Sequence, residues 1–286
     1  MKKFNYLAIV LMALVFTGCP ENPNNPEEPG IPSAGFTAKP FSVSASKQIV
    51  FSSGNLQYHC KNDKWRFAPN QTDYIGDANS NIAPDYDGWI DLFGWGTGTN
   101  PTNTSEDPND YQTFVDWGIN KIDNYIPNTW RTLSEEEWNY LRWERTDYLS
   151  LAGVAQVNGI NGLILLPDNW QCPNDITFKS GWPYDSEFLL GEDYSIYQSF
   201  TLKQWLKLES TGAVFLPSAG YRDYWRGEPD IWSIQRTGTY WSATVCTEYN
   251  ENEDAYGFYI NLGEPLFDCS EDKRIFGASV RLVKDL

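Results

Sequence analysis

The chemistry open to this chain is limited first by its histidines and cysteines. Its 286 residues include one histidine, His59, and five cysteines. One imidazole cannot build a His-rich metal centre, and a catalytic triad would consume it. The sequence contains no nucleophile elbow, phosphate-binding loop or zinc-ligand spacing. This inventory favours binding over catalysis, and we expect His59 to be structural.

Aromatic residues form the strongest candidate for a site. Phe, Trp and Tyr make up 16% of the chain. Exposed Trp and Tyr offer flat faces to sugar rings and large contact areas to protein partners. One group, interleaved with arginines, falls in a predicted polar loop at 221–237 and indicates a binding site for a glycan or a protein. Its expected ligand-binding residues are Tyr221, Arg222, Tyr224, Trp225, Arg226 and Trp232.

Buried aromatics that pin irregular loops are the alternative explanation of this composition. We expect Trp138, Trp205 and Trp241 to belong to the core.

A calcium site is a second candidate. Glu228-Pro229-Asp230 resembles the sugar-specificity triplet of calcium-dependent lectins, and Asn252 and Asp254 follow where a second triplet would fall. Carboxylate and amide oxygens are the ligands that calcium prefers. The spacing is loose, however, and the second triplet lacks its tryptophan. A solvated acidic turn is the favoured interpretation, and no cofactor is expected.

The N-terminus has the pattern of an export signal. Lys2 and Lys3 precede an apolar run of eleven residues, 6–16, which is shorter than the roughly 20 residues a membrane span needs. The run ends in a small-Gly-Cys sequence resembling a lipobox, which predicts lipidation of Cys19. We therefore expect a signal peptide at 1–18, a lipidated and disordered tether at 19–35, and one domain at 36–286.

The net charge of the chain limits the kinds of partner it can bind. Removal of residues 1–18 leaves 19 basic and 38 acidic residues, and 19 minus 38 gives a net charge of −19. Such acidity repels nucleic acid and anionic lipid. We expect contact with the outer membrane only through the lipid, and display at the cell surface.

Four cysteines remain after Cys19. In an oxidising compartment they can pair, and Cys246–Cys269 is the preferred bridge because both are expected in one sheet region. Free thiols are the alternative.

The predicted elements are two helices and several short strands. A capping box at Ser134 and Glu137 begins a helix over 132–141, and Thr201 caps a second that stops at Gly212. Strands are expected at 48–52, 160–166, 213–216, 238–244, 256–262 and 278–283. Two helices with short strands and long loops predict an α+β domain.

Several segments resemble known proteins. Residues 130–140, Trp-Arg-Thr-Leu-Ser-Glu-Glu-Glu-Trp-Asn-Tyr, are similar to the signature Arg-Leu-Pro-Thr-Glu-x-Glu-Trp-Glu-Tyr of the formylglycine-generating enzyme family, also called sulfatase-modifying factors. Segments 238–244 and 278–283 resemble strands of that superfamily. Segments 51–58, 88–96 and 279–283 resemble a set of gut-bacterial surface lipoproteins.

The resemblance implies a C-type-lectin-like fold with two main helices, small antiparallel sheets and long loops. Fold does not imply function. Formylglycine-generating enzymes use two close cysteines, and the matching region here offers only Cys246. We therefore expect a non-enzymatic binding module. An enzyme of this type with diverged chemistry, or a structural part of a surface complex, are the alternatives.

Overall fold

A computed structural model describes most of the chain beyond its N-terminal segment. The described residues are 38–181, 197–225, 227–247, 253–261 and 266–286. The predicted signal peptide, Cys19 and the tether lie outside them. Ala34–Leu286 form one compact unit by their contacts. The described elements are short strands in small sheets and a few short helices, which confirms the α+β class.

The strands range from two to nine residues in length. They are β1 (Phe41–Ser42), β2 (Gln48–Phe51), β3 (Leu56–His59), β4 (Lys64–Phe67), β5 (Trp89–Ile90), β6 (Ala152–Val157), β7 (Ile160–Leu165), β8 (Ser199–Phe200), β9 (Val214–Pro217), β10 (Tyr221–Trp225), β11 (Glu228–Trp232), β12 (Thr237–Val245), β13 (Asp254–Asn261), β14 (Leu266–Lys273) and β15 (Val283–Asp285).

The two main helices are α1 (Glu135–Asn139), which continues as a π-helical turn over Tyr140–Glu144, and α2 (Leu202–Ser210). Short 3-10 helices fill the loops at Gly76–Asn81, Pro108–Tyr111, Trp117–Ile119 and Tyr148–Ser150. Within the described residues, no helix is long and apolar enough to cross a membrane.

Local capping explains where both main helices begin. Ser134 and Glu137 form the predicted capping box, so α1 starts at 135 rather than 132. Thr201 caps α2 as predicted, with Gln204 completing a second box. Gly212, at φ +94°, follows the end of α2 in a conformation that favours glycine.

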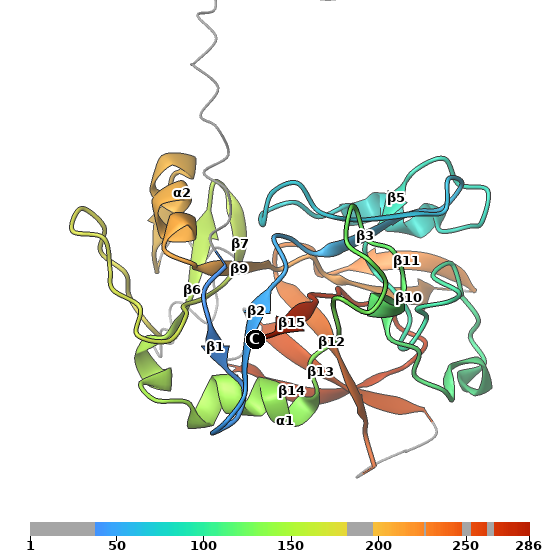
Figure 1. The fold of residues 1–286 in the computed structure, drawn as a ribbon. Coiled ribbons are helices and arrows are strands. Elements are labelled where there is room, and N and C mark those ends of the chain that lie inside the picture. The colour runs from blue at the N-terminus through green and yellow to red at the C-terminus, as the bar shows by residue number, and fades with distance from the viewer. Residues whose placement is uncertain (1–37, 182–196, 226, 248–252, 262–265) are drawn as a thin grey trace, which may run out of the picture. The chain divides into compact units, whose positions relative to one another are not determined.

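The strands pair into small, mostly antiparallel sheets (Figure 1). Their orders are β1-β2-β15, β4-β3-β5, β8-β6-β7-β9, β10-β11 and β12-β13-β14. Among the described strands, only β6 and β8 pair in parallel. In Figure 1, α1 lies at the lower edge of the β12-β13-β14 sheet and the β10-β11 hairpin lies to its right.

Large aromatic side chains fill the core between these sheets. Trp138, Trp205 and Trp241 are each at most 2% exposed, which confirms all three as core residues. Trp138 stacks on Phe258, so α1 covers one face of the β12-β13-β14 sheet. Burial of such rings is a major source of stability in a fold with short elements.

Two expectations about loops and strands were wrong. The segment 221–237 is mainly a hairpin of β10 and β11 rather than a loop. The segment 278–283 is not one strand: Ala278 and Ser279 make isolated bridges to Phe93 and Tyr240, and only β15 pairs with β2. The bridges of Ala278 and Ser279 join partners distant in sequence, which residue pattern alone does not reveal. The hairpin is local, because β10 and β11 follow one another in the chain, and the polar residues among its aromatics favoured a loop instead.

Candidate functional site

The β12-β13-β14 sheet has two different faces because successive residues of a strand point to opposite sides. Phe258 lies on the face towards α1, where its ring is 4.5 Å from that of Trp138 and within 10° of parallel. Tyr259, the next residue, therefore lies on the other face. It pairs directly with Thr239 of β12. The candidate site is on this second face.

Strand β10 supplies the opposite wall of a cleft of about 300 Å³ on this face. Tyr221 and Asp223 alternate along β10 and line the cleft. The full lining combines three aromatic rings, two carboxylates and two hydroxyls. It consists of Tyr221, Asp223, Thr239, Tyr259, Ser270, Asp272 and Phe276.

The rings in the cleft are partly exposed. Tyr221 and Phe276 lie with their centroids 5.9 Å apart and their planes tilted by 36°, which places them within ring-contact range. Tyr259 contributes the third ring from the floor. Partly exposed rings in a concave surface leave faces available to a ligand.

The charge of the cleft is negative. Burial raises the pKa of the Tyr221 hydroxyl above its ordinary value, and the charges of Asp223 and Asp272 raise it further. Asp223 accepts a 2.6 Å hydrogen bond from the backbone N–H of Tyr224 through Oδ1. Among the described residues that line the cleft there is no lysine or arginine.

The floor contains a buried hydroxyl. Thr239 is fully buried, and within the described part of the chain its Oγ1 has no hydrogen-bond partner. Neighbouring Gly257 keeps the floor open, because a Cβ there would lie 2.9 Å from Thr239 Cγ2. A buried hydroxyl that lacks a partner costs stability unless something else satisfies it.

The six predicted ligand-binding residues do not all lie on the same face of the β10-β11 hairpin. Tyr221 lines the cleft, and Trp232, paired with it across the hairpin, is 40% exposed. Arg222 and Tyr224 point the other way: Arg222 is fully buried, and its Nη1 donates to the Tyr224 hydroxyl over 2.6 Å.

The Tyr224 hydroxyl in turn donates to the Thr104 carbonyl over 2.6 Å. Arg222 and Tyr224 therefore hold a loop rather than face the cleft. The side chain of Trp225 and all of Arg226 lie outside the described residues.

The structure does not gather the candidate calcium ligands into a site that can be described. Glu228 and Asp230 are exposed on β11, Asp254 begins β13, and Asn252 lies outside the described residues. Over the described ranges, no three His, Cys, Asp or Glu side chains come together as metal ligands.

The expected Cys246–Cys269 disulfide is not formed in the structure. Strand β13 separates the strands that carry the two cysteines. The N–H of Cys246 bonds to the carbonyl of Asp254, whereas Cys269 pairs with Phe258, four residues further along β13. Four residues of strand span about 13 Å, and bridged Cα atoms usually lie about 4.4–6.8 Å apart.

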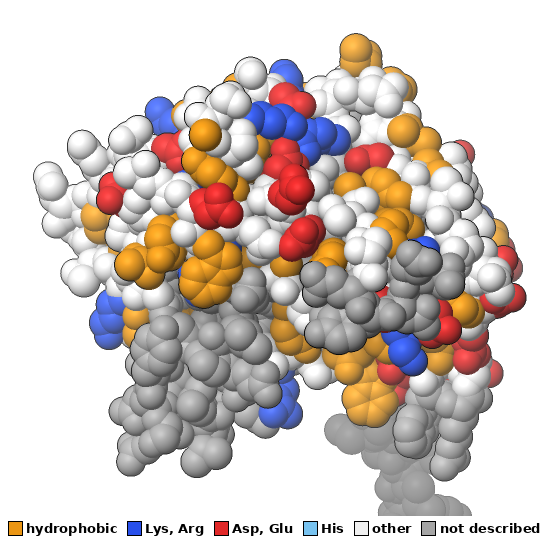
Figure 2. Space-filling view, turned by 90° about the horizontal axis from the view of Figure 1, so that it is seen from below, with side chains coloured by type: hydrophobic (Ala, Val, Ile, Leu, Met, Phe, Trp, Pro, Cys, Tyr) orange, Lys and Arg blue, Asp and Glu red, His pale blue; other side chains and the backbone are white. Residues whose placement is uncertain are grey.

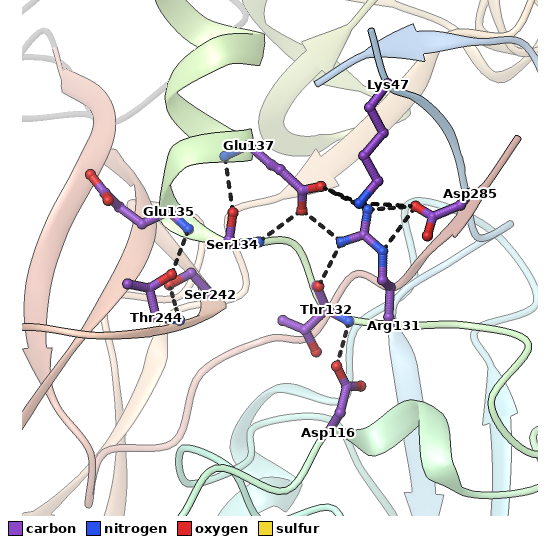
Figure 3. Close-up of polar contacts among 10 residues, drawn as sticks. All are labelled: Lys47, Asp116, Arg131, Thr132, Ser134, Glu135, Glu137, Ser242, Thr244 and Asp285. Carbon is purple, nitrogen blue, oxygen red and sulfur yellow. Dashed lines mark hydrogen bonds and ion pairs between the residues drawn. The ribbon is translucent and has the colours of Figure 1, made fainter. Parts of the chain in front are cut away.

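Residues of the segment 130–140 form a network of ion pairs with β2 and β15 and their flanks (Figure 3). Arg131 donates from Nη1 and Nη2 to the two carboxylate oxygens of Glu137, over 2.6 and 2.8 Å. It also donates to Asp285 Oδ1 from Nη2 and Nε, over 2.6 and 2.9 Å. Lys47 Nζ reaches Glu137 over 2.9 Å. We call these four residues the Arg131 network.

Each charge in the Arg131 network meets an opposite one. Burial alone would raise the pKa of Glu137, but hydrogen bonds from Arg131, the Ser134 backbone and Lys47 outweigh it and hold that pKa below its ordinary value. Arg131 likewise lowers the pKa of Asp285. The network thus ties the start of α1 to β15.

A second cleft, of about 530 Å³, lies beside the Arg131 network. Figure 2 shows acidic side chains gathered on this face over α1, next to a group of lysine and arginine side chains. The charged residues that line the cleft are Lys47, Glu135, Glu136, Glu137 and Glu144.

Two of these glutamates are already engaged: Glu137 in the network, and Glu135 with the Asn139 amide over 2.5 Å. The first cleft, which is lined by the rings of Tyr221, Tyr259 and Phe276 and is called the aromatic cleft below, is therefore the better candidate for ligand binding.

Sequence reasoning missed most of the cleft. Tyr259 and Thr239 fell in predicted strands but were not assigned a role, and Ser270, Asp272 and Phe276 belong to or follow β14, which was not predicted. The usable signal was the Arg226-Gly227 pair between two aromatic runs, since a two-residue turn with glycine is typical of a hairpin. Gly227 has φ +83°.

The chain matches no protein-family model, no curated protein and no solved structure.

Proposed function

We propose that this protein is a lipid-anchored, surface-exposed lipoprotein of the outer membrane that binds a glycan without chemically changing it. One sugar unit would occupy the aromatic cleft. The observation that carries the proposal is the meeting of three rings, two carboxylates and two hydroxyls in one concave site.

The physical argument rests on what sugars present. A sugar ring has apolar C–H faces, which stack on Tyr and Phe, and hydroxyls around its edge. Ionised carboxylates accept hydrogen bonds about twice as strong as neutral ones. The volume of about 300 Å³ lies at the lower end of the range for small-molecule sites. One or two sugar units would fit a site of this size better than a long buried chain.

The proposed anchor is Cys19, joined to the domain by residues 20–35. A solvated acidic and proline-rich tether would hold the cleft away from the membrane. The net charge of −19 after removal of residues 1–18 favours neutral or cationic glycans over sulfated or uronic ones.

The proposed fold is the C-type-lectin-like fold of the formylglycine-generating enzymes. Support comes from the signature segment 130–140, which contains α1, from segment 238–244 within β12, and from the small antiparallel sheets. A binding role is favoured over diverged enzyme chemistry because Cys246 is buried and lies far from Cys269, and because His59 is the only histidine.

A glycan array probed with the full-length, detergent-solubilised protein tests the proposal. We expect a restricted set of neutral or amine-bearing glycans to be retained. Tyr221→Ala and Tyr259→Ala should abolish that signal, whereas Tyr125→Ala, which removes a 45% exposed ring outside the cleft, should keep it. An array that retains no glycan, or one unchanged by both cleft variants, contradicts the proposal.

A further inference from the structure

The aromatic cleft contains more negative charge than the binding of a neutral sugar requires. Asp223 and Asp272 both line it. Asp230 is the direct cross-strand partner of Asp223 in the hairpin and so projects from the same face. Like charges placed this close repel one another, and a bound cation would relieve the repulsion.

No internal cation neutralises Asp223. Within the described part of the chain it forms no ion pair, and its polar contact is the Tyr224 N–H. Lys273 follows Asp272 at the end of β14, and its ammonium lies 6.0 Å from the centre of the Phe276 ring, one of the three rings that line the cleft. A ring of the cleft is thus already within reach of one cation.

Rings and carboxylates together favour an ammonium group. The face of an aromatic ring attracts a cation, and the attraction grows as water is excluded. A neutral hydroxyl of a ligand can donate a hydrogen bond to a carboxylate of the cleft. It is not attracted to the ring faces as a cation is, and it does not reduce the repulsion between the carboxylates. The cleft therefore distinguishes a protonated amine from a hydroxyl or an acetamide of similar size.

The buried hydroxyl of Thr239 is an independent sign that a ligand completes this site. It is fully buried at the floor, and among the described residues its Oγ1 has no partner. An edge hydroxyl of a sugar could provide one. A ligand that fits must combine a cation with hydroxyls, which a simple alkylamine does not.

From these observations we infer that the sugar unit in the cleft is an amino sugar with a free ammonium group, held between Asp223, Asp272 and the rings of Tyr221, Tyr259 and Phe276. This inference rests on the proposed function, because it specifies the kind of glycan.

Calorimetry with two matched tetrasaccharides tests it. One is the tetramer of glucosamine and the other is its fully N-acetylated form. The buffer would be at about pH 5.5, above the ordinary Asp pKa of about 3.9, with about 0.15 M salt, so that charges beyond about 8 Å are screened. We expect the free-amine tetramer to bind about tenfold more tightly.

Variants separate site binding from general attraction to an acidic protein. Asp223→Asn combined with Asp272→Asn should bring the two affinities within about threefold of each other. Asp77→Asn, an exposed acid outside the cleft, should leave the preference intact. Tyr221→Ala removes a ring of the cleft without changing the charge of the protein, and it should abolish binding of the glucosamine tetramer. Thermal melting would confirm that each variant is folded.

The outcomes are distinct. Equal affinity of the wild-type protein for both tetramers overturns the amino-sugar inference and leaves glycan binding standing. Absence of binding to either tetramer, together with an empty glycan array, overturns the proposed function itself. A preference that survives in the Asp223→Asn and Asp272→Asn double variant or in Tyr221→Ala places the interaction outside the cleft and also overturns the inference.

Discussion

The Arg131 network and the aromatic cleft lie on opposite sides of the β12-β13-β14 sheet and use similar residue types to different ends. In the network, Arg131 lies between Glu137 and Asp285, and Lys47 adds a second cation. In the cleft, Asp223 and Asp272 share one sign of charge, beside a buried hydroxyl without a partner among the described residues.

This difference indicates how polar side chains divide between stability and binding. Groups whose hydrogen bonds and charges are satisfied internally fix the fold, because breaking them leaves a buried charge. Groups left incomplete at a concave surface retain capacity for a ligand. By this measure, the segment 130–140 contributes to stability, and the cleft, where Asp223 forms no ion pair among the described residues, is the candidate for binding.

The largest expected effect is on the network. Arg131→Ala leaves Glu137, mostly buried, with only Lys47 as a cationic partner, and should lower the free energy of unfolding by about 2–3 kcal/mol. Urea denaturation measures this. Lys61→Ala, which breaks the exposed pair with Asp87, should lower the free energy of unfolding far less, because solvent and salt screen an exposed ion pair. Equal losses in the two variants would mean that the network is no more than a surface ion pair.

The next effect is the pH dependence of stability. The folded-state pKa values of Glu137 and Asp285 are lowered, so their contribution is fully present above their ordinary pKa values and is lost as the pH falls through the folded values. Between about pH 6 and about pH 3, the wild type should lose about 1 kcal/mol more than Arg131→Ala, a modest value because Asp285 is half exposed. Parallel pH profiles would contradict this assignment.

The smallest expected effect is that of removing one buried hydroxyl from the aromatic cleft or from beside the Arg131 network, and it distinguishes the two regions most clearly. Thr239 and Thr132 each carry a buried Oγ1 without a partner among the described residues, one in the cleft and one beside Arg131. Replacing either with Val should leave stability unchanged or raise it by up to about 1 kcal/mol. Only Thr239→Val should weaken glycan binding, by about fivefold. Calorimetry and thermal melting on the two variants measure both, and equal binding by them would remove Thr239 from the site.

Local chemistry in the sequence predicted the helix starts well. Ser134 with Glu137, and Thr201, act through neighbours three residues away, so spacing alone reveals them. The strands β2, β7, β9, β12 and β13 were also predicted within a few residues, because short runs rich in β-branched and aromatic residues are bounded there by polar or glycine-containing segments. Trp138, Trp205 and Trp241 were placed correctly in the core.

The residues that line the aromatic cleft could not be predicted in this way. Asp223 and Asp272 meet only because β14 pairs with β13 and β10 lies over the same face, and such pairing depends on register rather than composition. A hairpin at 221–232 would have placed Tyr221 and Asp223 on one face and Arg222 and Tyr224 on the other. The predicted loop obscured that alternation, so Arg222 and Tyr224 were grouped with Tyr221.

The central claim is that the aromatic cleft holds a sugar. Tyr259 tests it most directly because its ring lines the cleft on the sheet face opposite α1. The measurement is the dissociation constant of the glucosamine tetramer for the wild-type protein, Tyr259→Ala and Tyr125→Ala. We expect Tyr259→Ala to weaken binding by at least about tenfold and Tyr125→Ala to leave it unchanged. Wild-type affinity in folded Tyr259→Ala would contradict the claim.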